Sequence, residues 1–139
     1  MEKSIVSVKN LSHRYSVQWA VKDVSFEINE KGVTGLLGSN GAGKSTTMNI
    51  ICGVLNQTQG DVFINGVNLR EKPVEAKKNI GFLPQQPPLY TDLTVGEYLR
   101  HAAFLRLVEP DKVDEAVDEK IKKCSITHFR DRLIKNLSG

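Results

Sequence analysis

The chain has 139 residues with 19 basic and 16 acidic side chains, which give a formal net charge of +3, and 40% of its residues are apolar. These values are typical of an ordinary folded domain, and nothing in them indicates disorder. The longest apolar runs are only a few residues, far short of the roughly 20 that span a bilayer, so we expect a cytosolic chain without a signal peptide or membrane span. The basic residues are scattered along the chain, which gives no indication of a nucleic-acid partner.

The first part of the sequence contains three strand-like segments. Residues 5–8 and 24–28 alternate apolar with polar residues, which predicts two antiparallel, half-buried strands. Residues 33–37 form a short, nearly all-apolar run, which favours a strand buried on both faces.

A helix is predicted from about residue 45 to residue 55, because apolar residues recur there at helical spacing. Its predicted apolar face consists of Met48, Ile51, Cys52 and Leu55. Residues 61–64 then meet Asn65-Gly66, a strong hairpin signal, and residues 67–69 form the return strand. Residues 80–83 predict another short apolar strand, which ends at Pro84.

The last third of the sequence is predicted to be helical. Thr94 and Glu97 have the spacing of a capping box, which starts a helix. The apolar face of that helix is predicted to consist of Val95, Tyr98, Leu99, Ala102 and Leu105. A second helix is predicted after Pro110, with Val113, Val117, Ile121 and Cys124 on its buried side. The order of elements predicts a mixed α/β domain with a β extension and a helical appendage.

The segment between the all-apolar run and the first helix has the pattern G-x-x-x-x-G-K-[ST] of a phosphate-binding P-loop. It consists of Gly38, Ser39, Asn40, Gly41, Ala42, Gly43, Lys44 and Ser45. The glycines let backbone N–H groups curl around a phosphate, and the helix that follows adds the positive end of its dipole. Lys44 is expected to bridge the β- and γ-phosphates, and Ser45 is expected to offer a hydroxyl to Mg²⁺. We therefore expect a nucleoside triphosphate site.

The P-loop alone does not identify the nucleotide, because GTPases and many kinases use the same cradle. The chain contains no Asn-Lys-x-Asp tetrad of the kind that reads guanine, although such an element could lie beyond Gly139. A P-loop kinase or GTPase is therefore the weakest of the alternatives.

From about residue 5 to residue 139 the chain resembles the ATP-binding subunit of ATP-binding cassette (ABC) transporters. Four features carry the resemblance in order: residues 11–15 with residues 20–26, the P-loop followed by Thr46, residues 80–85, and residues 136–139. Asn-Leu-Ser-Gly at residues 136–139 matches the beginning of the family's Leu-Ser-Gly-Gly-Gln signature. Ser39 departs from the commoner family form, which often has proline there, at a permissive position.

The resemblance implies roles for residues outside the P-loop. Tyr15 would stack on adenine, with Trp19 as the rival stacking residue, and Thr46 would bind the α-phosphate. Gln85 resembles the Q-loop glutamine, which ligates Mg²⁺ or holds the attacking water, and Gln86 is the alternative at this position.

The signature residues are implied to act on a neighbouring subunit. Ser138 and Gly139 would contact the γ-phosphate bound by the opposite subunit, in a head-to-tail homodimer or with a paired ATPase subunit. A transmembrane permease would be the other partner. Within the family, the chain most resembles subunits of ABC-2-type or multidrug exporters. The resemblance is carried by residues 45–48, 87–90 and 93–99.

The resemblance implies a P-loop NTPase core of the RecA-like type with a mostly parallel sheet, an antiparallel β subdomain and a helical subdomain. We expect one incomplete domain over residues 1–139, with the β subdomain and core over about residues 1–90 and the helical subdomain over about residues 91–139. The Walker B aspartate and catalytic glutamate would lie beyond Gly139, so no catalytic residue is assigned here and the chain is expected to bind Mg-ATP with little turnover.

The expected function is that of an ATP-binding and ATP-hydrolysing subunit that powers transport through a permease. The chain would lie in the cytoplasm, peripheral on the inner face of the cell membrane. The alternative is a soluble ABC-type ATPase that acts on nucleic acid or ribosomes, which would usually need a basic arm or a second cassette.

Overall fold

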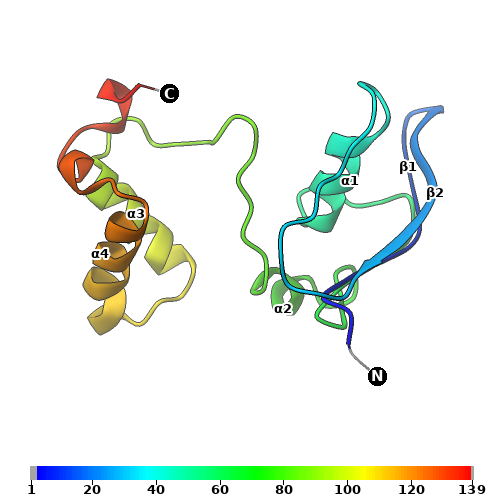
Figure 1. The fold of residues 1–139 in the computed structure, drawn as a ribbon, viewed down its shortest axis with the longest axis horizontal. Coiled ribbons are helices and arrows are strands. Elements are labelled where there is room, and N and C mark those ends of the chain that lie inside the picture. Colours follow the sequence, from blue (N-terminus) through cyan, green and yellow to red (C-terminus); the bar gives the residue numbers. More distant parts are fainter. Residues whose placement is uncertain (1–2, 139) are drawn as a thin grey trace. The chain divides into compact units, whose positions relative to one another are not determined.

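The computed structural model describes residues 3–138 of the chain. The chain divides into two compact units, Met1–Phe82 and Leu83–Gly139 (Figure 1). No helix in residues 3–138 is long and apolar enough to cross a membrane. The first unit holds the sheet and the P-loop, and the second is helical.

The first unit is built on a four-stranded antiparallel sheet with the strand order β2-β1-β3-β4. Its strands are β1 (Val6–Tyr15), β2 (Gln18–Ile28), β3 (Gln59–Ile64) and β4 (Val67–Asn68). The central strand β1 pairs with both neighbours, so that Val6 lies opposite Ile28 on one side and Ile64 on the other. The predicted antiparallel pairing is confirmed, and both strands are longer than their alternating segments.

An irregularity in β1 explains why alternation alone predicted too short a strand. The register between β1 and β2 shifts after Val8, and Asn10 there has a φ of 48°. Asn10 is held by its Nδ2, which donates to Asp23 Oδ1 at 2.9 Å, and by its backbone N–H, which donates to Ser25 Oγ at 2.8 Å. The bulge shifts the alternation of faces, and the strand continues beyond it.

The tight turn between β3 and β4 has the predicted hairpin conformation. Asn65 and Gly66 have φ angles of 49° and 78°. Two consecutive residues with positive φ are characteristic of a type I′ turn, whose twist matches that of the flanking strands. The predicted hairpin is therefore confirmed.

Helix α1 (Lys44–Ile51) packs on this sheet through a face that only partly matches the predicted one. Ile50 is completely buried in the core, together with Val8, Leu11, Val21, Val62, Ile64, Leu69 and Ala76. Ile51 and Leu55 pack partly against this core, but Met48 is 42% exposed. Two residues along a helix correspond to a rotation of about 200°, so Met48 points away when Ile50 points inward. Placing Met48 on the buried face was therefore wrong.

Two predicted strands are not formed in the described residues. Residues 33–37 and 80–83 have no strand pairing, and Val33, Leu37 and Leu83 are largely exposed. A strand needs a neighbour to receive its backbone hydrogen bonds, and no described strand lies alongside either segment. The expected parallel sheet is therefore absent from residues 3–138. Helix α2 (Pro73–Lys77), which begins at a proline, was not predicted.

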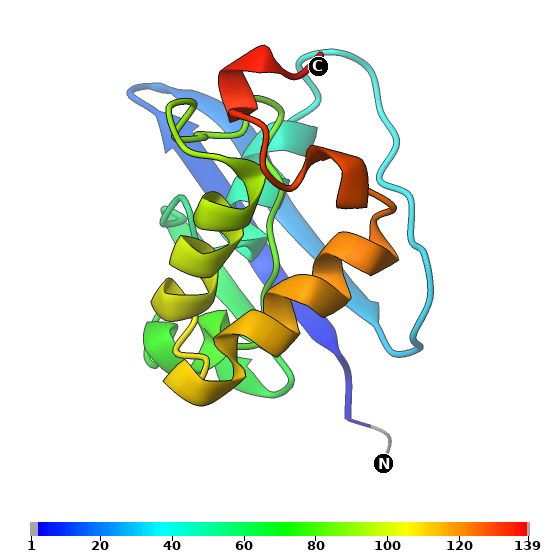
Figure 2. The same ribbon diagram turned by 90° about the vertical axis from the view of Figure 1, so that its left-hand side faces the viewer.

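The second unit is built on helices α3 (Val95–Leu105) and α4 (Val113–Lys123), which lie side by side in Figures 1 and 2. Short 3₁₀ turns η1 (Pro110–Lys112), η2 (Thr127–Phe129) and η3 (Ile134–Asn136) complete it. The predicted capping box is confirmed, because the Glu97 N–H donates to Thr94 Oγ1 at 3.2 Å and the Thr94 N–H donates to Glu97 Oε2 at 2.9 Å. The observed bounds of α3 and α4 also agree with the two helices that the sequence predicts.

The core of this unit follows most of the predicted face of α4. Val113, Val117 and Ile121 are buried. The residues that pack against them are Leu99, Ala103, Val108 and Ile126. Two expected core positions, Leu105 and Cys124, are exposed. Both lie where a helix ends, at the last residue of α3 and just after α4, so the helical pattern no longer holds them against the core.

Candidate nucleotide-binding site

The P-loop of residues 38–45 connects an extended segment to helix α1, as predicted. Gly43 caps the helix with a φ of 90°. A Cβ atom at Gly43 would lie 2.5 Å from the carbonyl oxygen of Ala20 on β2. Any larger residue would meet both an unfavourable backbone conformation and a fixed main-chain atom. Strand β2 therefore holds the loop against the sheet, and only glycine fits at their contact.

The first turn of α1 presents backbone donors. Gly43 has no side chain that could cap the helix, and its carbonyl accepts from Thr47 through both the N–H at 2.9 Å and Oγ1 at 2.8 Å. The N–H groups of residues 44–46 have no carbonyl one turn earlier in the helix to receive them. With the positive end of the helix dipole, these donors favour an anion such as phosphate.

The P-loop and the first turn of α1 line a pocket of ≈ 280 Å³. Its lining residues are Ala20, Ser39, Asn40, Gly41, Gly43, Lys44, Ser45 and Thr46. Within the loop, the Ala42 N–H donates to the Ser39 carbonyl at 3.1 Å, and Gly41 has a φ of 85°. The loop therefore curls around the pocket with small residues and backbone facing it. This arrangement fits the triphosphate of a nucleotide.

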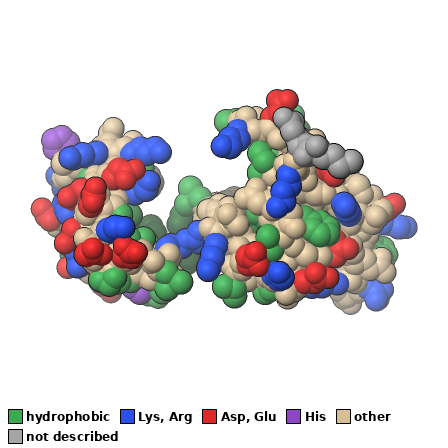
Figure 3. Space-filling view, turned by 90° about the horizontal axis from the view of Figure 1, so that it is seen from below, with side chains coloured by type: hydrophobic (Ala, Val, Ile, Leu, Met, Phe, Trp, Pro, Cys, Tyr) green, Lys and Arg blue, Asp and Glu red, His purple; other side chains and the backbone are tan. Residues whose placement is uncertain are grey.

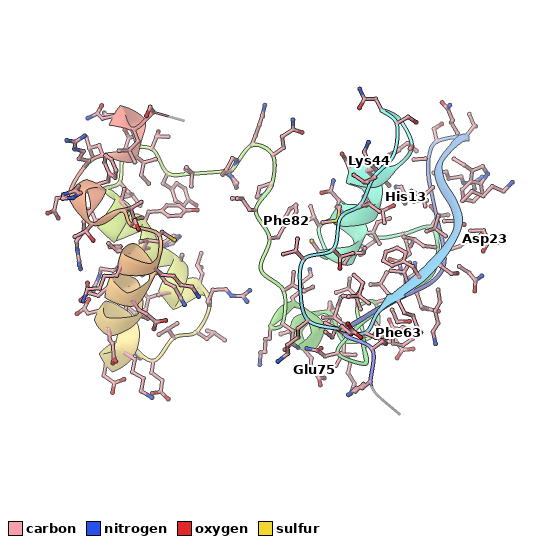
Figure 4. The ribbon with its side chains drawn as sticks, in the orientation of Figure 1. His13, Asp23, Lys44, Phe63, Glu75 and Phe82 are labelled. Carbon is pink, nitrogen blue, oxygen red and sulfur yellow. The ribbon has the colours of Figure 1, made fainter. Side chains whose placement is uncertain are left out.

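Lys44 provides the positive charge of the pocket. Its Nζ donates to the carbonyl oxygen of Ser39 at 3.2 Å and to that of Gly38. These acceptors are neutral, and an ionised phosphate oxygen forms a stronger hydrogen bond with an ammonium group. The side chain is thus held within the loop (Figure 4), with acceptors that a phosphate could replace.

Tyr15 lies beside the P-loop helix. Its hydroxyl is 3.3 Å from Thr46 Oγ1, and the residue is 54% exposed. The Tyr15 ring also meets the edge of the His13 ring, with centroids 4.8 Å apart and an interplanar angle of 83°. The structure therefore brings Tyr15 and Thr46 together, two of the residues predicted to contact the nucleotide.

Trp19, the rival stacking residue, is held on the other side of the β1–β2 hairpin. Trp19 lies opposite Arg14 in the register, and the Arg14 guanidinium is 5.4 Å from the Trp19 ring centroid. Cross-strand partners share a face of the sheet, and the neighbouring residue Tyr15 points to the opposite face. Of the two rival stacking residues, Tyr15 is therefore the one that lies on the side of the P-loop helix.

The remaining predicted site residues belong to the second unit. Gln85 and Gln86 lie on an exposed loop, and Ser138 is exposed after η3. Gly139 lies outside the described residues. The structure does not test the composite site that would combine these residues with the P-loop, and their roles stay predictions.

The segment that leads to Ser138 is fixed to the start of α3 by backbone hydrogen bonds. The Lys135 N–H donates to Thr91 at 3.0 Å, and the Ile134 N–H donates to Leu93 at 2.9 Å. Ser138 then lines a pocket of ≈ 430 Å³ with Val95, Ile126, Phe129, Arg132, Asn136 and Leu137. The described part of the predicted signature, up to Ser138, is therefore attached to a defined scaffold.

Two residues of the site were missed by the sequence analysis. Ala20 lines the pocket because the register of β2 brings it to the P-loop, which the sequence alone did not indicate. His13 contacts Tyr15, and its position two residues earlier on a strand was a usable signal, since residues two apart share a face.

Comparison with protein families gives a match to the model described as "ABC transporter" over residues 21–139. The chain belongs to the ABC transporter family. The match includes the P-loop, which is the centre of the pocket described above.

Curated members of the ABC family are similar over nearly the whole chain. The lipopolysaccharide export system ATP-binding protein LptB of Haemophilus influenzae is 38% identical over 98% of this chain and 58% of its own length. The uncharacterized ABC transporter ATP-binding protein YxlF of Bacillus subtilis is 34% identical over 97% of this chain and 44% of its own length. The phospholipid-transporting ATPase ABCA3 of Rattus norvegicus is 33% identical over 96% of this chain and 8% of its own length. The chain thus spans about half the length of the first two.

Solved structures of ABC subunits share the fold. An ATP-binding subunit of an ABC transporter superposes with a TM-score of 0.84 at 29% identity, over 97% of this chain and 56% of that one. CbiO1 from Clostridium perfringens, part of the ABC transporter complex cbiONQ, superposes with a TM-score of 0.82 at 27% identity, over 99% of this chain and 57% of that one. The predicted fold class, a P-loop NTPase domain of the ABC type, is confirmed by these neighbours.

Proposed function

We propose that this chain forms the ATP-binding part of an ABC transporter subunit, which binds Mg-ATP at the P-loop and hydrolyses it to power transport. The observation that carries the proposal is the pocket at the start of α1. There, β2 lies against Gly43, the first N–H groups of the helix have no helical partners, and Lys44 Nζ donates to loop carbonyls that a phosphate could replace. Family membership supports ATP as the nucleotide.

Each residue of the pocket has a proposed task. The N–H groups of the loop and Lys44 hold the β- and γ-phosphates, Ser45 ligates Mg²⁺, and Thr46 binds the α-phosphate. The bound Mg²⁺ neutralises charge that develops on the phosphates during hydrolysis. Tyr15 stacks on the adenine, which supports the base without reading its hydrogen-bonding edge.

The second unit is proposed to complete the site. Gln85 would ligate Mg²⁺ or hold the attacking water. Ser138 and Gly139 would contact the γ-phosphate bound by a second subunit, in a head-to-tail homodimer or with a paired ATPase subunit. No residue of this chain is assigned as the group that activates water.

The proposed partner in transport is a transmembrane permease, with the ATPase lying in the cytoplasm against the inner face of the membrane. Names of relatives such as "lipopolysaccharide export system" and "ABC transporter complex" support a transport role. The lean toward ABC-2-type or multidrug exporters stays a prediction. The nucleic-acid alternative has less support, since basic and acidic side chains are interspersed on the face shown in Figure 3.

Calorimetry with Mg-ATP tests the proposal. The unmodified protein should bind, and Lys44→Ala should weaken binding by about tenfold or more, because a charge-assisted contact to phosphate is lost. Lys31→Ala is the matched control, since Lys31 is an exposed lysine of the same unit away from the pocket lining. Equal affinities for Lys44→Ala and Lys31→Ala would mean that the P-loop is not the site.

A further inference from the structure

His13 is a buried polar residue to which the proposed function gives no task. It is 8% exposed, although histidine retains a polar ring that usually reaches water. It lies on β1 two residues before Tyr15, whose hydroxyl contacts Thr46 on helix α1 (Figure 4). The His13 ring therefore lies against the Tyr15 ring, which meets the P-loop helix at its hydroxyl.

The orientation of the His13 ring is fixed by Thr58. The Arg14 N–H donates to Thr58 Oγ1 at 3.2 Å, and that same oxygen is 3.4 Å from His13 Nδ1. Either atom of this Thr58–His13 hydrogen bond can be the donor, depending on the tautomer of the imidazole. Thr58 itself is held by its N–H, which donates to the Ser12 carbonyl at 3.1 Å. The imidazole thus has a defined direction set by the turn before β3.

The fixed His13 ring in turn supports Tyr15. Their edge-to-face contact, at 4.8 Å and 83°, is the arrangement that aromatic rings favour. The other end of Tyr15 is 3.3 Å from Thr46 Oγ1, so the tyrosine is held at its ring by His13 and at its hydroxyl by α1. Tyr15 is 54% exposed, so loss of the His13 contact would leave its ring with more freedom to rotate.

We propose that His13 is a positioning residue of the nucleotide site, which holds the Tyr15 ring ready to stack on the base of a bound nucleotide. This inference rests on the proposed function, because it requires that the P-loop binds the phosphates and Tyr15 the base. A ring that is already ordered loses less conformational entropy on binding, so His13 strengthens binding without touching the ligand. Its effect is therefore confined to ligands that carry a base.

The test compares Mg-ATP with inorganic tripolyphosphate, which has the phosphates but no base. Calorimetry on the purified protein should show that His13→Ala weakens Mg-ATP binding about 3- to 10-fold, which is the fold-change expected for one aromatic pair. Its affinity for tripolyphosphate should stay unchanged. His13→Phe, which retains a ring edge, should recover most of the loss. Equal weakening of both ligands would overturn the proposal, since it would show a merely structural role.

A double-mutant cycle isolates the path through Tyr15. In a Tyr15→Ala background, His13→Ala should have no further effect on Mg-ATP binding, and a full additional loss would contradict the proposal. If His13→Ala does not fold, Thr58→Val gives the same comparison from an exposed position and should weaken Mg-ATP alone by a smaller factor. In that case, an unchanged Mg-ATP affinity of Thr58→Val would contradict the positioning role of His13.

The outcome separates this inference from the proposed function. If the unmodified protein binds neither Mg-ATP nor tripolyphosphate, the proposed function fails. The unmodified protein could instead bind Mg-ATP and tripolyphosphate with equal affinity, with neither affinity changed by Tyr15→Ala. In that case the phosphate site stands and the positioning role of His13 is refuted.

Discussion

Residues 38–46 and Tyr15 contact one another within the first unit, whereas Gln85 and Ser138 lie on exposed segments of the second. In the first unit the contacts are made by the chain itself: β2 against Gly43 and Tyr15 against Thr46. In the second unit the segment before Ser138 is hydrogen-bonded to Thr91 and Leu93, just before α3, and Gln85 and Ser138 are exposed. The P-loop part of the proposed site is therefore formed by contacts within the first unit alone.

The largest expected effect comes from Gly43→Ala. The new Cβ would meet the Ala20 carbonyl at 2.5 Å, at a φ of 90° that alanine adopts poorly. We expect a loss of about 2 kcal/mol or more in the free energy of unfolding and no measurable Mg-ATP binding. Thermal unfolding and calorimetry measure these two quantities.

Gly35→Ala is the matched control, because no atom lies within 4 Å of its ideal Cβ and it lies in the same unit. This variant should bind Mg-ATP as the unmodified protein does. Retained binding by Gly43→Ala would show that the contact with β2 does not shape the loop.

The next effect is expected from Tyr15→Ala. Removal of a stacking aromatic costs about 1–3 kcal/mol per base, so Mg-ATP affinity should fall by about fivefold or more. Tyr15→Phe keeps the ring and loses the hydroxyl that contacts Thr46, and should lose no more than about threefold. Trp19→Ala, on the other face of the hairpin, should leave affinity unchanged. A larger loss in Trp19→Ala than in Tyr15→Ala would reverse the assignment.

A smaller effect, on stability alone, is expected in the second unit. Thr94→Ala removes the cap of α3 and should lower the free energy of unfolding of that unit by about 1 kcal/mol. Thr94→Ser retains a hydroxyl acceptor and serves as the control. Mg-ATP affinity should be the same in all three proteins, and hydrogen exchange of α3 amides gives the local readout. An affinity loss in Thr94→Ala would contradict the division between the two units.

The smallest effect on binding is expected from Gln85→Ala. Gln85 is exposed on its loop, so its removal should change the affinity for Mg-ATP by less than about twofold in this protein. Calorimetry with Gln86→Ala in parallel distinguishes the two adjacent glutamines. A loss comparable with that of Tyr15→Ala would show that the second unit contributes to nucleotide binding without a partner.

The elements that the sequence predicted correctly are those specified by local chemistry. Asn65-Gly66 has the conformation that its turn requires, and Thr94 with Glu97 forms both hydrogen bonds of the capping box. The glycines, lysine and serine of the P-loop likewise identified the pocket, because the motif carries its own backbone requirements.

The errors share a different cause, which is dependence on tertiary neighbours. Residues 33–37 are apolar enough for a buried strand, but a strand forms only where another strand accepts its hydrogen bonds. Met48 fits a helical apolar pattern, yet Ile50 determines which side of α1 faces the core. The contact of Ala20 with the P-loop follows from strand register, which no motif encodes.

The most direct test of the account is a titration of the isotope-labelled protein with Mg-ATP, followed through backbone amide chemical shifts. The account predicts the largest shifts at the amides of residues 39–46 and of Tyr15, with saturation at a single affinity. Tripolyphosphate should reproduce the P-loop shifts and leave Tyr15 nearly unchanged. Shifts centred elsewhere, with the amides of residues 39–46 unaffected, would contradict the claim that this loop binds the nucleotide.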